Sequence, residues 1–297
     1  MFKRLVKIIA SVLGVDLRRI YAWIALWSLE KALSQQGLEK LVRKLREYVP
    51  DVSVQYSHSG GEDRQNGSFL EVKIRGQQAF QCSLMLEFFE NIAQSKRIFV
   101  VDIGDSAGTH MKYLKHLGTG RFDLETISVN LDPVAVEKIN QQGMKAILKR
   151  AEDITPTDIG GQVDLFTSFE MLEHLHAPAV FLRRLAKKHE GKSLLITVPY
   201  LRQSRVGMYH VRGAIRESIS AENEHIFELS PEDWSLLFLH SGWKVVYSKT
   251  YYQYPTGLLF LSPILAQFWK NTDFEGFWGA ILEKDMTFSD CYQDWEE

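Results

Sequence analysis

One stretch, FVVDIGDSAGTH at residues 99–110, constrains the fold more than any other part of the chain. Its apolar, β-branched start predicts a strand, and Gly104 and Gly108 predict a tight loop directly after it. Apolar residues with helical spacing follow at once. A strand, a tight loop and a helix form the first unit of an open α/β sheet, whose ligands bind at the carboxyl ends of the strands. The stretch therefore predicts a ligand site beside Asp102.

Strand and helix patterns alternate along the rest of the chain. Further strands are predicted at residues 124–131, 144–148, 163–168, 193–198 (halted by Pro199), 243–250 and 276–283. Helices are predicted at residues 77–94, 133–143, 179–189 and 231–239. This alternation predicts an α/β fold with a doubly wound, seven-stranded, mostly parallel, Rossmann-like sheet.

The sheet is expected to have a helical N-terminal extension. Residues 1–76 are interpreted as a helical arm and linker, and residues 77–297 as the domain, with insertions at about 200–224 and 251–275. Within the arm, residues 30–49 predict one amphipathic helix that ends at Pro50, and residues 69–74 predict a short strand or an extended lead-in. The aromatic, apolar insertion is either a helix that covers the sheet or an acceptor pocket or membrane contact.

Composition excludes some classes of protein. The hydrophobic fraction of 45% and the charged fraction of 24% are typical of a globular protein. A net charge of −2 argues against a protein built to neutralise nucleic-acid phosphates. Cys82 and Cys291 fit no metal-ligand spacing and are typical of free thiols in a reducing compartment.

The first 28 residues mix basic and apolar side chains, beginning MFKRLVKIIASVLG. They could form an arm packed on the domain, a basic amphipathic helix on an anionic membrane surface, or a cleaved signal peptide. Asp16 stands where a signal peptide needs small residues, and the apolar run 20–29 is about half of the ~20 residues that span a bilayer. We expect a cytoplasmic protein, with peripheral contact to the inner face of a membrane through residues 1–28 as the open alternative.

The loop at residues 99–110 can be compared with known ligand-binding motifs. A dinucleotide fingerprint needs glycine where this chain has Gly104, Ser106 and Thr109, so that motif is absent. The loop resembles the first motif of class I S-adenosylmethionine-dependent methyltransferases, [DE]-x-G-x-G-x-G. Asp102, Gly104 and Gly108 match it, and Ser106 replaces the middle glycine.

Further matches to this family extend over roughly residues 96–285. Asp132 matches the acid that accepts hydrogen bonds from the ribose hydroxyls, and it is also a candidate N-cap for the helix that follows. Glu152 and Asp153 fall where the family places its adenine-contacting acid. The run VDLFTSFEMLEHLHAP resembles the fourth motif and adds Phe169 to the expected cofactor-binding residues. The resemblance implies S-adenosylmethionine as the cofactor.

The segment Glu170-Met-Leu-Glu173-His174 allows three interpretations. If it is helical, its two carboxylates and its imidazole share one face. It is then a polar helix start, or it supplies a general base (Glu170, His174 or the downstream His225), or Glu170, Glu173, His174 and His225 hold a divalent metal. The E-x-x-E-H pattern resembles ubiquinone-biosynthesis O-methyltransferases and, with a downstream histidine, metal-dependent terminal-ribose methyltransferases of small RNAs. A metal is left open.

The resemblance therefore implies a methyltransferase, and the expected target is an oxygen of a small-molecule, glycan or lipid-linked acceptor. The arginines of residues 200–223 and the apolar insertion suggest an anionic or lipid-linked molecule handled near a membrane. Two alternatives stay open. A non-catalytic methyltransferase-like binding module is suggested by Ser106, and an RNA ribose methyltransferase by the E-x-x-E-H pattern, although the near-neutral charge argues against nucleic acid.

Overall fold

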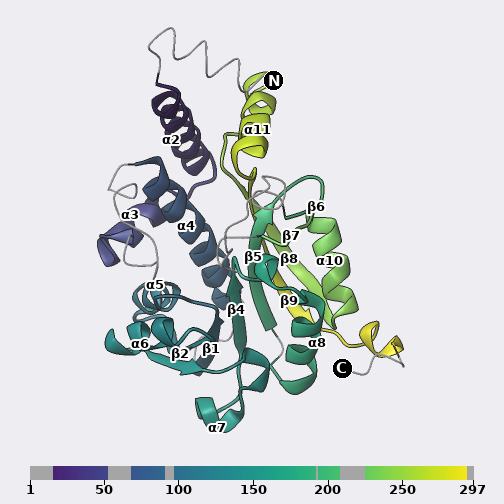
Figure 1. Cartoon of the computed structure of the whole chain (residues 1–297). Coiled ribbons are helices and arrows are strands. Elements are labelled where there is room, and N and C mark those ends of the chain that lie inside the picture. Colours follow the sequence, from purple (N-terminus) through teal and green to yellow (C-terminus); the bar gives the residue numbers. More distant parts are fainter. Residues whose placement is uncertain (1–15, 53–67, 91–96, 192, 208–224, 293–297) are drawn as a thin grey trace.

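A seven-stranded sheet forms the centre of the computed structural model, which describes residues 16–52, 68–90, 97–191, 193–207 and 225–292 (Figure 1). The strands are β1 (Arg97–Ile103), β2 (Asp123–Asn130), β3 (Lys145–Leu148), β4 (Leu165–Phe169), β5 (Ser193–Tyr200), β8 (Trp243–Tyr252) and β9 (Gly276–Lys284). Their order is β3-β2-β1-β4-β5-β9-β8. Strands β1 to β5 pair in parallel, whereas β9 runs antiparallel to both of its neighbours. The predicted fold class is confirmed.

Helices cover both faces of this sheet, because successive residues of each strand point to opposite sides. Leu195 of β5 belongs to the core beneath α4 (Phe69–Glu90), together with side chains of α5 (Thr109–Gly118) and α6 (Pro133–Gln141). Its neighbours Leu194 and Ile196 belong to the core beneath α8 (Pro178–Lys188) and α10 (Pro231–His240). A short α7 (Pro156–Ile159) follows β3, and a separate two-stranded pair joins β6 (Arg205–Val206) to β7 (Phe227–Glu228).

Strand β5 is longer than predicted. Pro199 does not halt it, since Pro199 pairs with Phe277 of β9 and the strand continues to Tyr200. Pairing between β4 and β5 ends at Thr197. Pro199 therefore lies where the strand has a neighbour on one side, and there a residue without an N–H group is tolerated.

The N-terminal helices differ from the sequence prediction in two places. The single helix predicted for residues 30–49 is wrong: α2 (Leu17–Gln35) and α3 (Glu39–Tyr48) are separated by Gly37, whose φ of +72° ends the first helix. The strand predicted for residues 69–74 is also wrong, because α4 begins at Phe69. Glu71 and Arg75 form an ion pair one turn apart, which favours the helix. The domain boundary at residue 77 falls inside α4 and stays a prediction.

The aromatic insertion contains α11 (Leu261–Thr272), which packs on α2. Trp269 Nε1 donates a hydrogen bond to Ser28 Oγ at 3.0 Å, and the rings of Tyr21 and Phe268 lie 5.3 Å apart. Both helices project from the same end of the molecule (Figure 1). Among the described residues, none of the helices has the length and apolar character needed to cross a bilayer. The first 15 residues of the N-terminal segment, and residues 208–224 of the other insertion, lie outside the described residues.

Candidate active site

The loop after β1 has the backbone conformation that its glycines predict. Gly104 has a φ of +87°, and its N–H donates to the Val129 carbonyl at 2.9 Å. Gly108, with a φ of +71°, is the N-cap of α5. A β-carbon on Gly104 would lie 3.1 Å from Met171 Cγ. Left-handed backbone at both positions explains why glycine occupies them.

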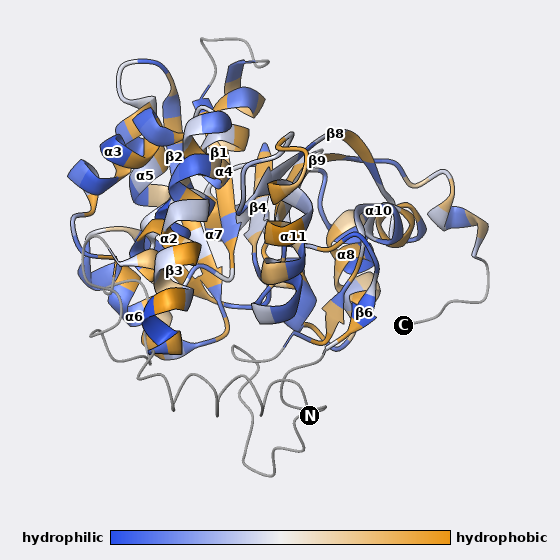
Figure 2. Cartoon of the chain, turned by 90° about the horizontal axis from the view of Figure 1, so that it is seen from above, coloured by the Kyte–Doolittle hydropathy of each residue, from blue (hydrophilic) through white to orange (hydrophobic). Residues whose placement is uncertain are grey.

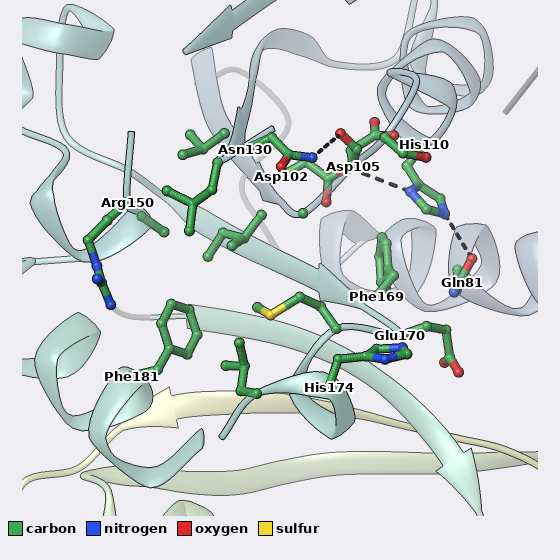
Figure 3. Close-up of a pocket in the computed structure, with 18 of the residues that line it drawn as sticks. Gln81, Asp102, Asp105, His110, Asn130, Arg150, Phe169, Glu170, His174 and Phe181 are labelled. Carbon is green, nitrogen blue, oxygen red and sulfur yellow. Dashed lines mark hydrogen bonds and ion pairs between the residues drawn. The ribbon is translucent and has the colours of Figure 1, made fainter. Parts of the chain in front are cut away.

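Asp105 holds this loop from inside. Its Oδ1 accepts hydrogen bonds from the N–H groups of Ala107 (3.0 Å) and Gly108 (2.9 Å). Its own carbonyl accepts a bond of 3.1 Å from the side chain of Asn130, at the end of β2 (Figure 3). Burial, together with the neighbouring Asp102 carboxylate, raises the pKa of Asp105 to about 7. The loop is thus tied to the adjacent strand and contains two carboxyl groups side by side.

Asp102 lies at the end of β1 and is 1% exposed. Its Oδ1 accepts a bond of 2.6 Å from Thr167, and His110 Nδ1 lies 3.6 Å from its Oδ2. The other ring nitrogen of His110 bonds to Gln81 of α4 at 2.9 Å (Figure 3). The Oδ2 atoms of Asp102 and Asp105 accept no hydrogen bond from the described residues. Two such buried acceptor atoms suit a cationic ligand group such as an ammonium.

These groups line a cavity of about 1280 Å³ at the carboxyl ends of the parallel strands. The predicted site residues that line it are Asp102, Gly104, Ser106, Glu152, Phe169, Glu170, His174 and His225. Those predicted residues that do not line it are Gly108, Asp132, Asp153 and Glu173. The structure therefore brings most of the predicted set to one cavity, and the role of each residue stays a prediction.

Three acids that were expected to contact the cofactor differ in their surroundings. Asp132 caps α6 by accepting a bond of 2.9 Å from the Val134 N–H, as its alternative interpretation predicts. Glu152 is 3% exposed, lines the cavity and accepts a bond of 3.1 Å from Arg150. Asp153, by contrast, is exposed and paired with a lysine. Of the two adjacent acids, Glu152 is the one placed to contact a ligand.

The segment after β4 is not the α-helix considered from the sequence. Glu170 has a φ of +50°, and a 3₁₀ turn, η4 (Leu172–His174), follows it. The Glu170 N–H donates to the Thr197 carbonyl at 2.9 Å, which holds the backbone in this unusual conformation. The prediction that these side chains share one helical face is therefore wrong. Tertiary contacts instead gather Glu173, His174 and His225, whose ligand atoms all lie within 4.8 Å of one another, without Glu170.

His225 is the centre of this second group. Its Nδ1 lies 3.1 Å from Glu228 Oε1, and Arg205 forms an ion pair with Glu228. The rings of His225 and His174 are 4.7 Å apart, edge to face. Burial raises the pKa of Glu228, but its hydrogen bonds to His225 and Arg205 outweigh burial and lower the pKa overall. Glu228 is therefore an anion that orients the imidazole.

The two glutamates of the E-x-x-E-H segment have the opposite electrostatic character. Burial raises the pKa of Glu170 to about 7. Burial, followed by the Glu170 charge, raises the pKa of Glu173 well above its ordinary value.

One carboxylate and two imidazoles form a mixed oxygen and nitrogen donor set, which suits several divalent ions. The four-residue metal site stays a prediction, and Glu173, His174 and His225 are the members whose ligand atoms lie together.

Sequence reasoning missed much of the cavity wall, including the polar residues Gln81, Asp105, His110 and Asn130. Asp105 and His110 stand inside the loop that was recognised, so polar residues within the motif were an available signal. Gln81 belongs to a helix whose polar residues at this point are buried, and it bonds to both His110 and Thr197. A glutamine inside an apolar helical pattern could therefore have indicated that α4 contributes to the site.

Comparison with known proteins identifies the family. Residues 74–248, more than half of the chain, match a family described as the methyltransferase domain. The chain belongs to this family. It is a class I S-adenosylmethionine-dependent methyltransferase, as the motifs implied. A search of the curated proteins finds no match.

One solved structure supports this fold, and a second is similar over a shorter part of the chain. A provisionally named sarcosine dimethylglycine methyltransferase from Galdieria sulphuraria has a TM-score of 0.50 and 14% identity, over 82% of this chain and 98% of that chain. The 1,6-didemethyltoxoflavin-N1-methyltransferase of Burkholderia thailandensis, crystallised with S-adenosylhomocysteine, has a TM-score of 0.48 and 12% identity, over 73% of this chain and 85% of that chain. At such low identity, the Galdieria likeness supports the fold alone.

The cavity of this methyltransferase fits S-adenosylmethionine. The buried carboxyl groups of Asp102 and Asp105, whose Oδ2 atoms accept no hydrogen bond from the described residues, suit the ammonium group of a methionine moiety. The left-handed Gly104 lets backbone lie close to the ligand. Asn130 and Glu152 line the wall beyond and offer acceptors for hydroxyl or amino groups.

Proposed function

We propose that this methyltransferase methylates a hydroxyl oxygen of a small-molecule, glycan or lipid-linked acceptor, with His225 as the general base. The observation that carries the proposal is the chain of contacts from Arg205 through Glu228 to His225, which ends at the cavity wall. A hydroxyl acceptor needs such a base because its proton must leave as the new bond forms, whereas a carboxylate acceptor does not.

S-adenosylmethionine, when bound, supplies a methyl group on a positively charged sulfur. Asp102 and Asp105 would hold its ammonium end, Asn130 and Glu152 its nucleoside end, and Phe169 lies against the His110 ring at 4.7 Å beside the loop. These residues orient the donor, and orientation is a large part of catalysis in a direct displacement.

The neighbours of His225 orient its imidazole for the role of general base. With Nδ1 directed at Glu228, the neutral imidazole of His225 donates from Nδ1 and presents Nε2 as an acceptor. The hydroxyl proton passes to Nε2, and the Glu228 anion stabilises the imidazolium that results. His174, whose ring lies edge to face with His225, is the second candidate. Glu170, with its pKa of about 7, can remain protonated and donate a hydrogen bond to the acceptor.

The acceptor end of the cavity combines apolar and polar groups. Ile74, Phe274 and Phe277 line it together with Gln77 of α4. The arginines of residues 200–223 were expected to attract an anionic acceptor. Among the described residues, Arg202 and Arg205 each form an ion pair with a glutamate, which weakens this attraction. An uncharged hydroxyl group is therefore the acceptor that these surroundings favour. Membrane contact through residues 1–28 belongs to the same proposal.

Methyl transfer to a panel of phenols, sugars, lipid-linked glycans and small RNAs tests this function, with the methylated atom located by mass spectrometry. His225→Asn is expected to lower kcat by about 10²–10⁴-fold while the Kd for S-adenosylmethionine changes less than about twofold. Glu228→Gln is expected to lower kcat by about tenfold or more, because the imidazolium formed in the reaction loses its anionic partner.

Three results decide between the alternatives. Methylation of nitrogen or carbon, or an unchanged kcat in His225→Asn, would contradict the proposal. Methylated ribose would instead favour the RNA alternative. Activity that is lost with EDTA and restored by Mg²⁺ or Mn²⁺ would indicate a metal. If Glu173→Gln abolishes this restored activity, the metal belongs to the group of Glu173, His174 and His225.

A further inference from the structure

Large apolar side chains are exposed at one end of the molecule. In residues 258–264, Leu259 is 83% exposed, Phe260 80% and Ile264 64%. Leu258 and Leu261 are exposed as well, so five large apolar side chains face solvent within seven residues. We call residues 258–264 the apolar tip. A concentration of this kind marks an interaction surface more often than a free surface.

A second set of exposed apolar side chains lies on α2, the helix that packs against α11. Trp23 of α2 is 68% exposed and Ile20 is 43% exposed. The Gln35 side chain donates a hydrogen bond of 2.6 Å to the Thr256 carbonyl, just before the apolar tip, which joins the two elements. Figure 2 looks down on this end of the molecule and shows apolar turns on α11. The two surfaces therefore belong to one lobe, formed by α2 and α11.

Charge in this lobe differs from charge in the rest of the chain. Residues 16–35 contain Arg18, Arg19 and Lys31 against Asp16 and Glu30, although the whole chain has a net charge of −2. Residues 254–272 contain Lys270 and no acid. Arg18 and Arg19 are exposed on the first turn of α2, near Ile20. Positive charge thus accompanies the exposed apolar side chains.

We propose that the apolar tip inserts into an anionic lipid bilayer, with α2 alongside it. Exposed Leu, Phe and Trp side chains next to basic residues have the pattern of proteins that rest on membrane surfaces. Anionic lipid attracts the Arg and Lys side chains, whereas a second copy of this chain would bring like charges together. This inference adds the apolar tip, which lies outside the N-terminal arm, and it does not depend on the proposed base.

The same lobe leads to the active site. Phe274, two residues after α11, lines the cavity, and Lys73 of α4 lies 4.6 Å over its ring. Lys73 also pairs with Asp273, which ties the end of α11 to α4. A bilayer at the apolar tip would therefore face the acceptor end of the cavity through α11, which is the arrangement that a lipid-linked acceptor needs.

Vesicle flotation of the full-length protein tests the proposal, with phosphatidylcholine vesicles that contain or lack phosphatidylglycerol. The protein is expected to float with the anionic vesicles, and Leu259→Ser/Phe260→Ser is expected to reduce the bound fraction by about tenfold or more. The matched control is Leu236→Ser/Val246→Ser, which changes two exposed apolar residues of α10 and β8. It is expected to float like the unchanged protein.

Both double variants should keep the melting temperature and the Kd for S-adenosylmethionine, since the altered residues are exposed and do not line the cavity. An unchanged protein that floats with neither vesicle would overturn the proposal. So would a Leu259→Ser/Phe260→Ser variant that floats as well as the control. A dimer that this variant converts to a monomer, without flotation of either, would assign the apolar tip to a second copy instead. Loss of methyl transfer in His225→Asn leaves flotation unaffected, so the two proposals fail separately.

Discussion

Backbone contacts at Gly207 and Ile226 position His225. The Gly207 N–H donates to the Ile226 carbonyl at 2.7 Å, and the Ile226 N–H donates to the Glu173 carbonyl, also at 2.7 Å. A β-carbon on Gly207 would lie 1.6 Å from the His225 carbonyl oxygen. Because this neighbour is backbone, it cannot rotate away as a side chain would. Glycine at this position lets the two backbones approach closely enough to position His225.

Gly207→Ala is therefore expected to displace His225 and to lower kcat by about tenfold or more, because misplaced catalytic groups lose most of their effect. The Kd for S-adenosylmethionine should stay within about twofold, since Gly207 does not line the cavity. Gly120→Ala is the control. No atom lies within 4 Å of its β-carbon, and its φ of +72° limits the effect to about 1–2 kcal/mol of stability. Equal activity in the two variants would refute the positioning role.

At the scale of elements, α4 connects the N-terminal helices to the active site. One end of it carries Glu71 and Arg75, which are both fully buried and ion-paired, and Arg46 of α3 joins them from its surface position. One turn further on, buried Gln78 and Gln81 bond to Tyr113 and His110. A single helix thus packs the arm and supplies part of the cavity wall.

Glu71→Gln is expected to destabilise the protein by about 3–5 kcal/mol at pH 7, because the buried Arg75 loses its counter-ion. Arg46→Ala, at a side chain that is 44% exposed, should cost about 1 kcal/mol. Burial raises the pKa of Glu71, but the bonds from Arg46 and Arg75 lower it overall. Its contribution is therefore present above the unfolded pKa of about 4.3 and is lost as pH falls through the lower folded value. When measured by urea unfolding, the difference in the free energy of unfolding between Glu71→Gln and the unchanged protein should become smaller below about pH 4.

At the scale of the whole molecule, the buried acids at the sheet edge oppose stability at neutral pH. Asp105 faces Asp102 and His110, and its pKa is raised to about 7. In the unfolded chain its pKa is about 3.9. A group with a raised folded pKa stabilises fully below the unfolded value, and this stabilisation is lost as pH rises through the folded value. The site is thus built for ligand binding at the expense of folding stability.

Asp105→Asn keeps an acceptor oxygen for the N–H groups of Ala107 and Gly108 and removes the titration. The stability of this variant relative to the unchanged protein should rise between about pH 4 and about pH 7 and stay level above that range. Chemical unfolding without cofactor measures it. The Kd for S-adenosylmethionine should increase in the same variant, because one of the two acids that suit the ammonium is lost. A constant difference in stability across the pH range would contradict the assignment.

Local patterns predict the fold well and the site in part. The loop at residues 99–110, the cap at Asp132, and the alternation of strands and helices along the chain follow from short-range rules on turns, caps and periodicity. The errors at residues 69–74 and at Pro199 have a tertiary cause. The ion pair around Glu71 rests partly on α3, and Pro199 is accommodated because β5 has lost one of its neighbours there.

The sequence by itself determined which segments are strands and helices, the first glycine loop and the methyl donor, because each depends on residues close together in the chain. Only the tertiary structure decided which acids face the cavity and which histidine gains an anionic partner. Glu170 and Glu173 share no helical face, and His225 meets Glu173 and His174 across about fifty residues of chain. Such contacts depend on where β4 and β5 end in the main sheet and on how the separate strand β7 packs against η4 and β5, and the spacing of residues does not specify that.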